Sequence, residues 1–342
     1  MRIGLAGYGA WGHMHAGAIG RIEGLSLGAV LCGSDQAAAL ATQELPGVTI
    51  YRDFAAMLAD PTIDLVDIVV PNHLHASMAV AAVEAGKHVL LEKPMATTLA
   101  DAERVVAAVE RSGRYLGVGL ELHVSRQWAK VRELISGGSI GQARYANLTL
   151  FRRPFRGGSG NWRRTRRTVG SWILEEPIHY IDLLLWYFRE HGLPVELSAD
   201  GIPSPLGAGM YDAFTATLRF ADGAYAVFSQ CLGGFEHSLV LEIAGDQGAL
   251  RTWWSGVIDR TDTPDFELKL RRAGAETAEI VDVERSGEVF ELEEQLRRLV
   301  TDVPGRTPLV SARDALPSLR ICLEIERALA ERRSIELVWA DK

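Results

Sequence analysis

Apolar residues along the first third of the chain come in short blocks that alternate with helical patterns. Short apolar runs bounded by polar residues or glycine are typical of strands buried on both faces of a parallel sheet. The strands expected are Arg2–Ala6, Leu25–Leu31, Leu65–Val70, His88–Leu91 and Tyr115–Val118. The helices expected between them are His13–Ile22, Gln36–Gln43, Ala76–Ala85 and Leu99–Arg111. This alternation predicts an α/β domain over about residues 1–120, with a doubly wound parallel sheet.

The pattern changes after this point, and the second part of the chain is expected to be an α+β domain over residues 121–342. Strand-like runs follow one another with turn signals between them, which indicates an antiparallel sheet. These runs are Ala143–Phe151, Ala213–Phe220, Tyr225–Cys231, Leu239–Ile243 and Phe266–Leu270. Helical patterns cover Trp128–Ile135, Ile173–Phe188, Val289–Val300 and Ala312–Ala330. Asp222-Gly223 separates two of the strands and is a good hairpin turn.

The first expected strand leads into a glycine-rich turn, Gly7-Tyr8-Gly9-Ala10-Trp11-Gly12, and then into a helix. Gly7 permits a tight turn, Gly9 lets the backbone approach a phosphate, and Gly12 lets the helix pack closely on the strand. The helix N-terminus offers free N–H groups and the positive end of its dipole. We therefore expect a Rossmann-type dinucleotide site at Gly7, Gly9, Ala10, Trp11 and Gly12.

Composition narrows the class of protein. The chain has 342 residues and a net charge of −8, which argues against nucleic acid as a partner. No apolar run is long enough to span a bilayer, and the chain opens directly on a strand, so we expect neither a membrane partner nor a signal peptide. Cys32, Cys231 and Cys322 are far apart, form no metal-binding spacing and suit a reducing cytoplasm.

Two further segments carry candidate chemistry. Glu92-Lys93-Pro94 follows the expected strand His88–Leu91, and ligands of doubly wound sheets bind beyond the carboxyl ends of the strands. Later, Glu175, His179 and Asp182 stand at i, i+4 and i+7, which on one helix would place them on one face. That row could orient a basic imidazole, bind a metal or be a solvated helix face, and spacing alone leaves the three interpretations open.

These motifs together resemble the Gfo/Idh/MocA family, the glucose–fructose oxidoreductases, inositol dehydrogenases and their relatives. The resemblance rests on the glycine turn, Pro71-Asn72-His73-Leu74-His75, Glu92-Lys93-Pro94 and the Glu-x-x-x-His-x-x-Asp segment, and it extends over nearly the whole chain. It implies a large, mainly antiparallel and open-faced second sheet that walls a cleft over the cofactor. The family pattern is usually Asp-x-Gly-x-His-x-x-Asp. Here Glu175 and Pro177 replace the first Asp and the Gly, so the reach of the carboxylate to a substrate changes.

The resemblance also implies roles for these residues. Lys93 would hydrogen-bond the reacting hydroxyl and the nicotinamide ribose, and His179 would take the hydroxyl proton. Glu175 would contact substrate hydroxyls and Asp182 would support the histidine. No metal is needed for such chemistry, so we expect none. Residues expected to line the cofactor besides the glycine turn are Pro71, Asn72, His75, Glu92 and Lys93.

The choice between NAD and NADP depends on the end of the second strand. An acid there selects NAD by binding the ribose 2′-hydroxyl, but Cys32 occupies that position, followed by Gly33 and Ser34. With no acid to repel it, a 2′-phosphate could be accepted, although no arginine or lysine adjoins these residues in the sequence. The cofactor is therefore NAD or NADP, with a slight preference for NADP.

The segment 152–167 contains seven arginines around Trp162 and precedes the catalytic segment. It could be a solvated basic loop or a contact between subunits. In the sharper interpretation, Arg163 or Arg164 clamps an anionic or heavily hydroxylated sugar and Trp162 stacks on it. Glu121 and His123, after the fifth strand, would also face the substrate.

The sequence therefore predicts an NAD(P)-dependent dehydrogenase or reductase acting on a secondary hydroxyl or ketone of a sugar, cyclitol or sugar derivative. Two alternatives remain open. One is an NAD-dependent enzyme that cleaves a glycosidic bond through transient oxidation, and the other is a non-catalytic NAD(P)-binding regulator. A homodimer or homotetramer is expected from the resemblance.

Overall fold

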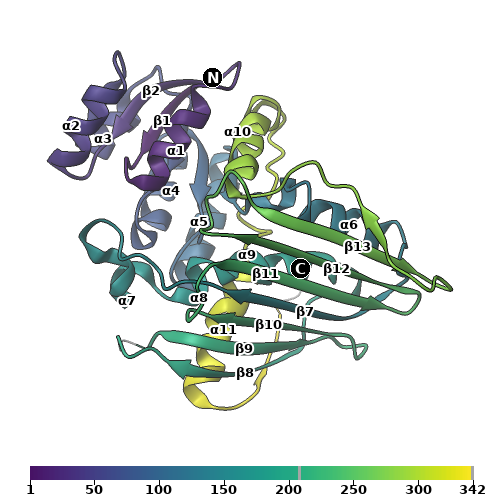
Figure 1. Cartoon of the computed structure of the whole chain (residues 1–342). Coiled ribbons are helices and arrows are strands. Elements are labelled where there is room, and N and C mark those ends of the chain that lie inside the picture. The colour runs from purple at the N-terminus through teal and green to yellow at the C-terminus, as the bar shows by residue number, and fades with distance from the viewer. Residues whose placement is uncertain (207–208, 340–342) are drawn as a thin grey trace. The chain divides into compact units, whose positions relative to one another are not determined.

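A computed structural model describes residues 1–206 and 209–339 (Figure 1). Contacts divide the chain into two compact units. The first unit joins Met1–Glu121 to Arg167–Gly170 and Leu292–Leu319. The second unit comprises Leu122–Arg166, Ser171–Glu291 and the chain from Arg320 onward.

The first unit contains a sheet of six described strands, all parallel, in the order β3-β2-β1-β4-β5-β6. This is the order of a Rossmann fold, and it confirms the predicted doubly wound sheet. The strands are β1 (Arg2–Ala6), β2 (Ser26–Leu31), β3 (Thr49–Tyr51), β4 (Leu65–Ile68), β5 (His88–Glu92) and β6 (Leu116–Gly119). The helices are α1 (Ala10–Ile19), α2 (Asp35–Glu44), α3 (Phe54–Ala59), α4 (His75–Glu84) and α5 (Leu99–Ser112). β3 and α3 were not predicted, because a three-residue edge strand carries too little pattern.

A helix from the far end of the sequence completes the first unit. The apolar positions of α10 (Glu288–Gly305) recur at helical spacing, and Leu292, Leu296, Leu299 and Val303 are buried together with Ile3 and other residues of the first unit. A single boundary near residue 120 therefore does not describe these contacts, because the apolar face of α10 belongs to the first core.

The second unit is built on a sheet of nine described strands in the order β14-β13-β12-β11-β7-β10-β9-β8-β15. Neighbouring strands run antiparallel except β7 and β10, which are parallel. The first five are β7 (Ala143–Phe151), β8 (Glu196–Pro203), β9 (Tyr211–Arg219), β10 (Tyr225–Cys231) and β11 (His237–Gly245). The others are β12 (Gly248–Gly256), β13 (Asp265–Arg272), β14 (Glu279–Val281) and β15 (Ile335–Glu336). The mainly antiparallel sheet and the Asp222-Gly223 hairpin between β9 and β10 are confirmed.

The two faces of this sheet differ. Along β7 the burial alternates, so that Leu148 and Leu150 are fully buried while Thr149 between them is partly exposed. Helix α9 packs against β7 and β10, and Figure 1 shows α11 running across β8 and β9. The helices of this unit include α6 (Trp128–Ser136), α8 (Trp172–Glu175), α9 (Pro177–Tyr187) and, from Arg320 onward, α11 (Leu316–Glu331).

The predicted continuous helix Ile173–Phe188 is wrong. The chain forms two helices, α8 and α9, and Glu176 between them has non-helical dihedral angles of φ −134° and ψ −42°. Pro177 is the cause, because proline has no N–H and restricts the residue before it, and so suits the first position of a helix.

Candidate active site

The glycine turn of the first unit has the geometry of a phosphate site. Gly7 has φ +107°, and a Cβ on it would lie 2.2 Å from the carbonyl oxygen of Val69. A Cβ on Gly12 would lie 2.0 Å from the carbonyl oxygen of Gly7, so α1 can approach β1 only without a side chain there. A Cβ on Gly9 would meet no described atom within 4 Å. No side chain caps α1 and no acid lies in its first turn, which leaves its N–H groups for an anion. The residues present therefore fit a dinucleotide.

The end of β2 combines a buried thiol with an open turn. Cys32 is buried in a cluster with Leu5 and Val30, and burial raises the pKa of its thiol. Gly33 and Ser34 are exposed, and the Ser34 hydroxyl accepts a hydrogen bond from the backbone N–H of Ala37 at the start of α2.

Arginine is absent beside these residues in the sequence but present beside them in space. Arg52, one residue after β3, lies close enough to Cys32 to lower the pKa of the thiol, and its Nη2 is 3.0 Å from Oδ1 of Asp35. Sequence reasoning missed this cation because it comes from the neighbouring strand. Its only signal was the position of Arg52 after a short apolar run.

Side chains of the segment after β4 form hydrogen bonds with nearby backbone carbonyl groups. Asn72 is buried and donates a hydrogen bond to the carbonyl of Val169, 3.0 Å away. The two ring nitrogens of His75 lie 2.7 Å from the carbonyl oxygen of Pro94 and 2.8 Å from that of Val70. His75 therefore links the end of β4 to the segment after Lys93, and Pro71 starts the turn that carries Asn72.

Glu92 and Lys93 differ in exposure at the end of β5. The Glu92 side chain is buried, 6 % exposed, whereas Lys93 is partly exposed on the loop that follows. The Glu92 carboxylate lies 3.3 Å from Nε2 of His15 and accepts a hydrogen bond from Trp11, both on α1. Because parallel strands end at one edge of a sheet, Lys93 lies at the same edge as the glycine turn.

In the second unit the helix break separates Glu175 from the other two members of the predicted row. Glu175 ends α8, whereas His179 and Asp182 lie on α9, three residues apart, and all three are buried. Oδ2 of Asp182 is 2.6 Å from Nε2 of His123, whose ring stacks on Trp186 with centroids 4.1 Å apart. Asp182 therefore pairs with His123, and sequence spacing gave no sign of this pairing.

Arginines of the loop 152–167 pair with the two glutamates of the break. Nε of Arg163 donates to Oε1 of Glu175, and the guanidinium lies 4.3 Å from the centre of the Trp162 ring. Arg164 is exposed. Glu121 is buried, 4 % exposed, after β6. The structure thus brings Arg163, Trp162 and Glu175 together within the second unit and leaves Arg164 outside that contact.

A second ionic group was not predicted. The Arg152 guanidinium contacts the Glu176 carboxylate, whose Oε1 lies 3.2 Å from Nε2 of the buried His237. Burial lowers the pKa of His237, the charge of Arg152 lowers it further, and Asp259 offsets part of this, so that the pKa is about 3. Arg152 belongs to the arginine-rich segment noted above, but nothing in the sequence singles it out or joins it to His237.

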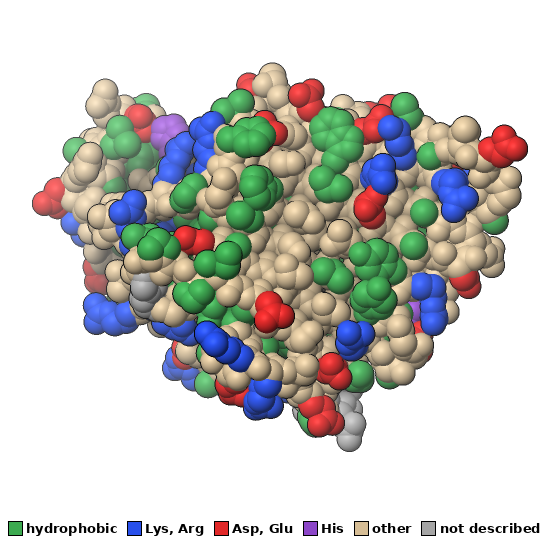
Figure 2. Space-filling model, turned by 60° about the horizontal axis from the view of Figure 1, so that its bottom comes forward, with side chains coloured by type: hydrophobic (Ala, Val, Ile, Leu, Met, Phe, Trp, Pro, Cys, Tyr) green, Lys and Arg blue, Asp and Glu red, His purple; other side chains and the backbone are tan. Residues whose placement is uncertain are grey.

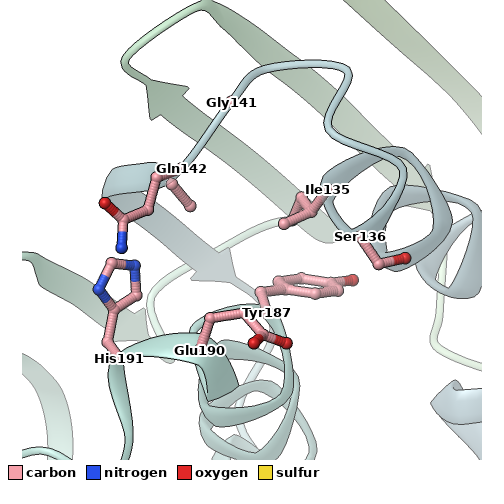
Figure 3. A pocket seen from close by; sticks show the side chains of 8 residues that line it. Ile135, Ser136, Gly141, Gln142, Tyr187, Glu190 and His191 are labelled. Carbon is pink, nitrogen blue, oxygen red and sulfur yellow. The ribbon is translucent and has the colours of Figure 1, made fainter.

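A separate hollow of about 370 Å³ lies within the second unit (Figure 3). Tyr187 and the His191 ring point into it, and Nδ1 of His191 is 2.8 Å from Oδ2 of Asp222. It is lined by Ile135, Ser136, Gly141, Gln142, Ala143, Tyr187, Glu190 and His191. None of the residues predicted for catalysis or binding lines it.

Among residues 1–206 and 209–339, no group of three or more His, Cys, Asp and Glu side chains is arranged to hold a metal ion. Over the same residues, no helix combines the length and apolar character needed to cross a membrane.

Two family models match this chain, one in the first unit and one in the second. Residues 1–120 match the family model described as "Oxidoreductase family, NAD-binding Rossmann fold", and residues 128–251 match the "GFO/IDH/MocA C-terminal domain". The chain belongs to the Gfo/Idh/MocA family. It is therefore an oxidoreductase with an NAD(P)-binding Rossmann unit, as the motifs predict.

Members of this family similar to the chain include named sugar and cyclitol enzymes. Myo-inositol 2-dehydrogenase of Thermotoga maritima is 24 % identical over 98 % of both chains. 1,5-Anhydro-D-fructose reductase of Ensifer adhaerens is 29 % identical over 76 % of this chain and 77 % of its own. The solved structure of levoglucosan dehydrogenase in complex with NADH has a TM-score of 0.85 at 21 % identity, covering 99 % of this chain and all of its own. That likeness shows the shared fold.

Proposed function

We propose that this Gfo/Idh/MocA chain transfers a hydride between a nicotinamide cofactor and a secondary hydroxyl or ketone of a sugar, cyclitol or sugar derivative. The observation that carries the proposal is the uncapped N-terminus of α1, with open space at Gly9, at the same sheet edge as Lys93. The dehydrogenases and reductase named above support the substrate class.

Lys93 and His179 divide the proton chemistry in this proposal. When bound, the nicotinamide accepts or donates the hydride at C4. During oxidation the Lys93 ammonium stabilises the developing alkoxide, and His179 takes the hydroxyl proton, so a C–H and an O–H bond break and a C=O bond forms. Arg163 pairs with Glu175 and so holds its carboxylate in one position. The carboxylate can then accept hydrogen bonds from substrate hydroxyls.

A spectrophotometric screen tests this function. Sugars, inositols and sugar acids are incubated with the protein and NAD or NADP, and formation of reduced nicotinamide is followed. We expect Lys93→Ala and His179→Ala to lower kcat by about 100-fold or more on any active substrate, because each removes a proton-handling group. Lys130→Ala is the control, since Lys130 pairs with Glu133 on the surface of α6. Equal activity of Lys93→Ala and Lys130→Ala would exclude the proposed role.

We propose that the cofactor site accepts NADP, with Arg52 as the contact for the 2′-phosphate. Arg52 supplies the cation that the sequence near Gly33 and Ser34 lacks, and Asp35 is its partner. Arg52→Ala should raise KM for NADP more than KM for NAD, whereas Asp35→Asn should lower KM for NADP because it removes a repelling charge. Strong preference of the unaltered enzyme for NAD would contradict this proposal.

We propose that the substrate is a neutral polyol rather than a strongly anionic sugar. Arg163 already compensates the charge of Glu175, so an anion would have to displace the carboxylate from the guanidinium. Arg163→Ala and Arg164→Ala are compared on neutral and acidic sugars. We expect the larger rise in KM for Arg163→Ala on neutral sugars, and unchanged KM in both variants would end the idea.

We propose assembly into a homodimer or homotetramer through the open face of the nine-stranded sheet. This face carries Val240, Thr149 and Ser229 in register, with Val240 39 % exposed. Figure 2 shows hydrophobic side chains and uncharged atoms over the middle of the surface in view, with charged groups more frequent toward its borders. Light scattering after gel filtration of the protein and of Val240→Glu tests this, and an unchanged monomer in both contradicts it.

A cytoplasmic location is also part of the proposal. Cys32, Cys231 and Cys322 are all free thiols in the structure, which suits a reducing compartment. Fractionation of cells that express the protein is the direct measurement.

A further inference from the structure

A carboxylate lies inside the core of the first unit, in the middle of a strand. Asp67 of β4 is fully buried within the otherwise apolar run Leu65–Ile68. An isolated carboxylate there would cost several kcal/mol, so it requires a cationic partner. His15 of α1, also fully buried, provides it, with Nδ1 2.8 Å from Oδ2 of Asp67.

The second nitrogen of the same imidazole faces a second carboxylate. Nε2 of His15 lies 3.3 Å from Oε1 of Glu92 at the end of β5. Burial lowers the pKa of His15, but the charge of Asp67 and the contacts with both carboxylates raise it to about 10. At Glu92 the contact with His15, together with the charge of Lys93 and the Trp11 hydrogen bond, outweighs burial and lowers the pKa to about 2. We call Asp67, His15 and Glu92 the buried ion chain.

The Glu92 carboxylate also has a hydrogen-bond donor on α1 and space left for it by a glycine of the neighbouring strand. Trp11 donates a hydrogen bond to it from one turn before His15 on α1, and the two rings meet edge to face at 5.3 Å. Gly119 of β6, the neighbour of Glu92 in the sheet, leaves room for it, because a Cβ there would lie 3.0 Å from Oε1. Oδ1 of Asp67 and Nε2 of His15 have no hydrogen-bond partner among the described residues, so the 3.3 Å contact between His15 and Glu92 is an ion pair.

The buried ion chain connects two segments whose relative position matters for the proposed reaction. α1 begins at the dinucleotide turn, and Lys93 directly follows Glu92. We propose that His15 is a positioning residue for Lys93, holding the Glu92 end of β5 against the helix that carries the cofactor turn. This rests on the proposed function only in giving Lys93 its role at the reacting hydroxyl.

A role in stability alone would not require this arrangement. Replacing buried ion pairs by apolar side chains of similar volume is often neutral or stabilising, so a buried ion chain is weak support for a purely structural purpose. The buried ion chain instead fixes the position of the groups attached to it. Small misplacements of a catalytic group can lower rates by about 100-fold.

The kinetic test compares two isosteric variants that each remove one carboxylate from the same imidazole. Glu92→Gln releases the end attached to Lys93, and Asp67→Asn releases the other end. We expect Glu92→Gln to lower kcat about tenfold or more with KM for the cofactor changed less than about threefold, and Asp67→Asn to lower kcat less. Equal losses in both variants, or wild-type kcat in Glu92→Gln, would overturn the proposal.

A second measurement does not need a substrate. The chain's lysines are Lys87, Lys93, Lys130, Lys269 and Lys342, so reductive methylation with ¹³C gives few NMR signals, and Lys93→Arg assigns that of Lys93. We expect Glu92→Gln to shift the Lys93 signal, Asp67→Asn to shift it less and the other lysine signals to stay in place. An unmoved Lys93 signal in Glu92→Gln overturns the proposal. Failure of every sugar in the unaltered enzyme instead counts against the proposed function, and the NMR result still decides the positioning role.

Discussion

His15 and His237 are both buried histidines beside a glutamate, yet they differ in charge. His15 lies between Asp67 and Glu92, and its pKa rises to about 10. His237 contacts Glu176, but burial, reinforced by the charge of Arg152 on the same carboxylate, lowers the pKa of His237 to about 3. At neutral pH the first is therefore a cation and the second is neutral. Burial lowers the pKa of both imidazoles, and only at His15 do two carboxylates with no competing cation outweigh it.

Replacing the cation should have the largest effect. His15→Gln leaves two buried carboxylates without a charge between them, and we expect a loss of about 3–5 kcal/mol in the free energy of unfolding. His237→Gln is the matched control and should cost about 1 kcal/mol or less, because a neutral group replaces a neutral group. Urea unfolding followed by circular dichroism measures both. Equal losses would show that the two histidines do not differ in charge.

The pH dependence of stability should differ in direction between the two sites. His15 has a folded pKa above its ordinary value of 6.5, so its contribution is complete below pH 6.5 and is lost as the pH rises toward about 10. His237 has a folded pKa below 6.5, so its contribution is complete above pH 6.5 and is lost as the pH falls toward about 3. Each effect is on the order of a few kcal/mol.

Unfolding of the protein and of His237→Gln from pH 3 to 10 separates these effects. The stability difference between the two proteins should change only on the acid side. A difference that is constant below pH 6.5 would contradict a neutral His237.

Removing Arg152 should raise the pKa of His237. In Arg152→Met, Glu176 faces His237 without a competing cation, so the pKa of His237 should rise from about 3, while burial still holds it below the ordinary value of 6.5. Titration of the His237 ring proton by NMR measures this. Arg153→Met is the control, since the Arg153 side chain donates to the carbonyl of Phe235 outside this ionic group.

The smallest expected effect concerns the indole at the first site. Trp11→Phe keeps an aromatic ring beside His15 but removes the donor to Glu92, and we expect a loss of about 1 kcal/mol in stability. The charge of His15 should persist, because both carboxylates remain. Nitrogen chemical shifts of the His15 ring at neutral pH would reveal any deprotonation.

Much of the fold could be predicted from sequence because its signals are local. Alternating apolar runs and helical patterns identified the parallel strands from β1 to β6 apart from β3, and Asp222-Gly223 identified a hairpin. The short strand β3 and the return of α10 to the first core could not be read this way, because edge strands carry little pattern and long-range packing has no local signal. Pro177 was visible, and its effect on a helix is known, so the continuous helix was an avoidable error.

Candidate site residues were found where a motif carries them, as at the glycine turn and Lys93. Partners contributed by distant segments were missed, namely Arg52 beside Asp35, His123 beside Asp182 and Arg152 beside Glu176. One signal was available: Asp67 stands in a run of buried apolar residues, and a carboxylate in such a place implies a cation nearby. Its identity, His15, depends on how α1 packs on the sheet.

The position of α10 has a consequence for synthesis of the protein. The dinucleotide unit begins at Met1, but its core includes Leu292, Leu296 and Leu299. At about 5–20 residues per second, a ribosome takes many seconds to reach that helix after the first strands have emerged. Until then an apolar surface over α1 and the sheet stays uncovered. The first unit therefore begins to fold early in synthesis but can complete its core only after α10 has been made.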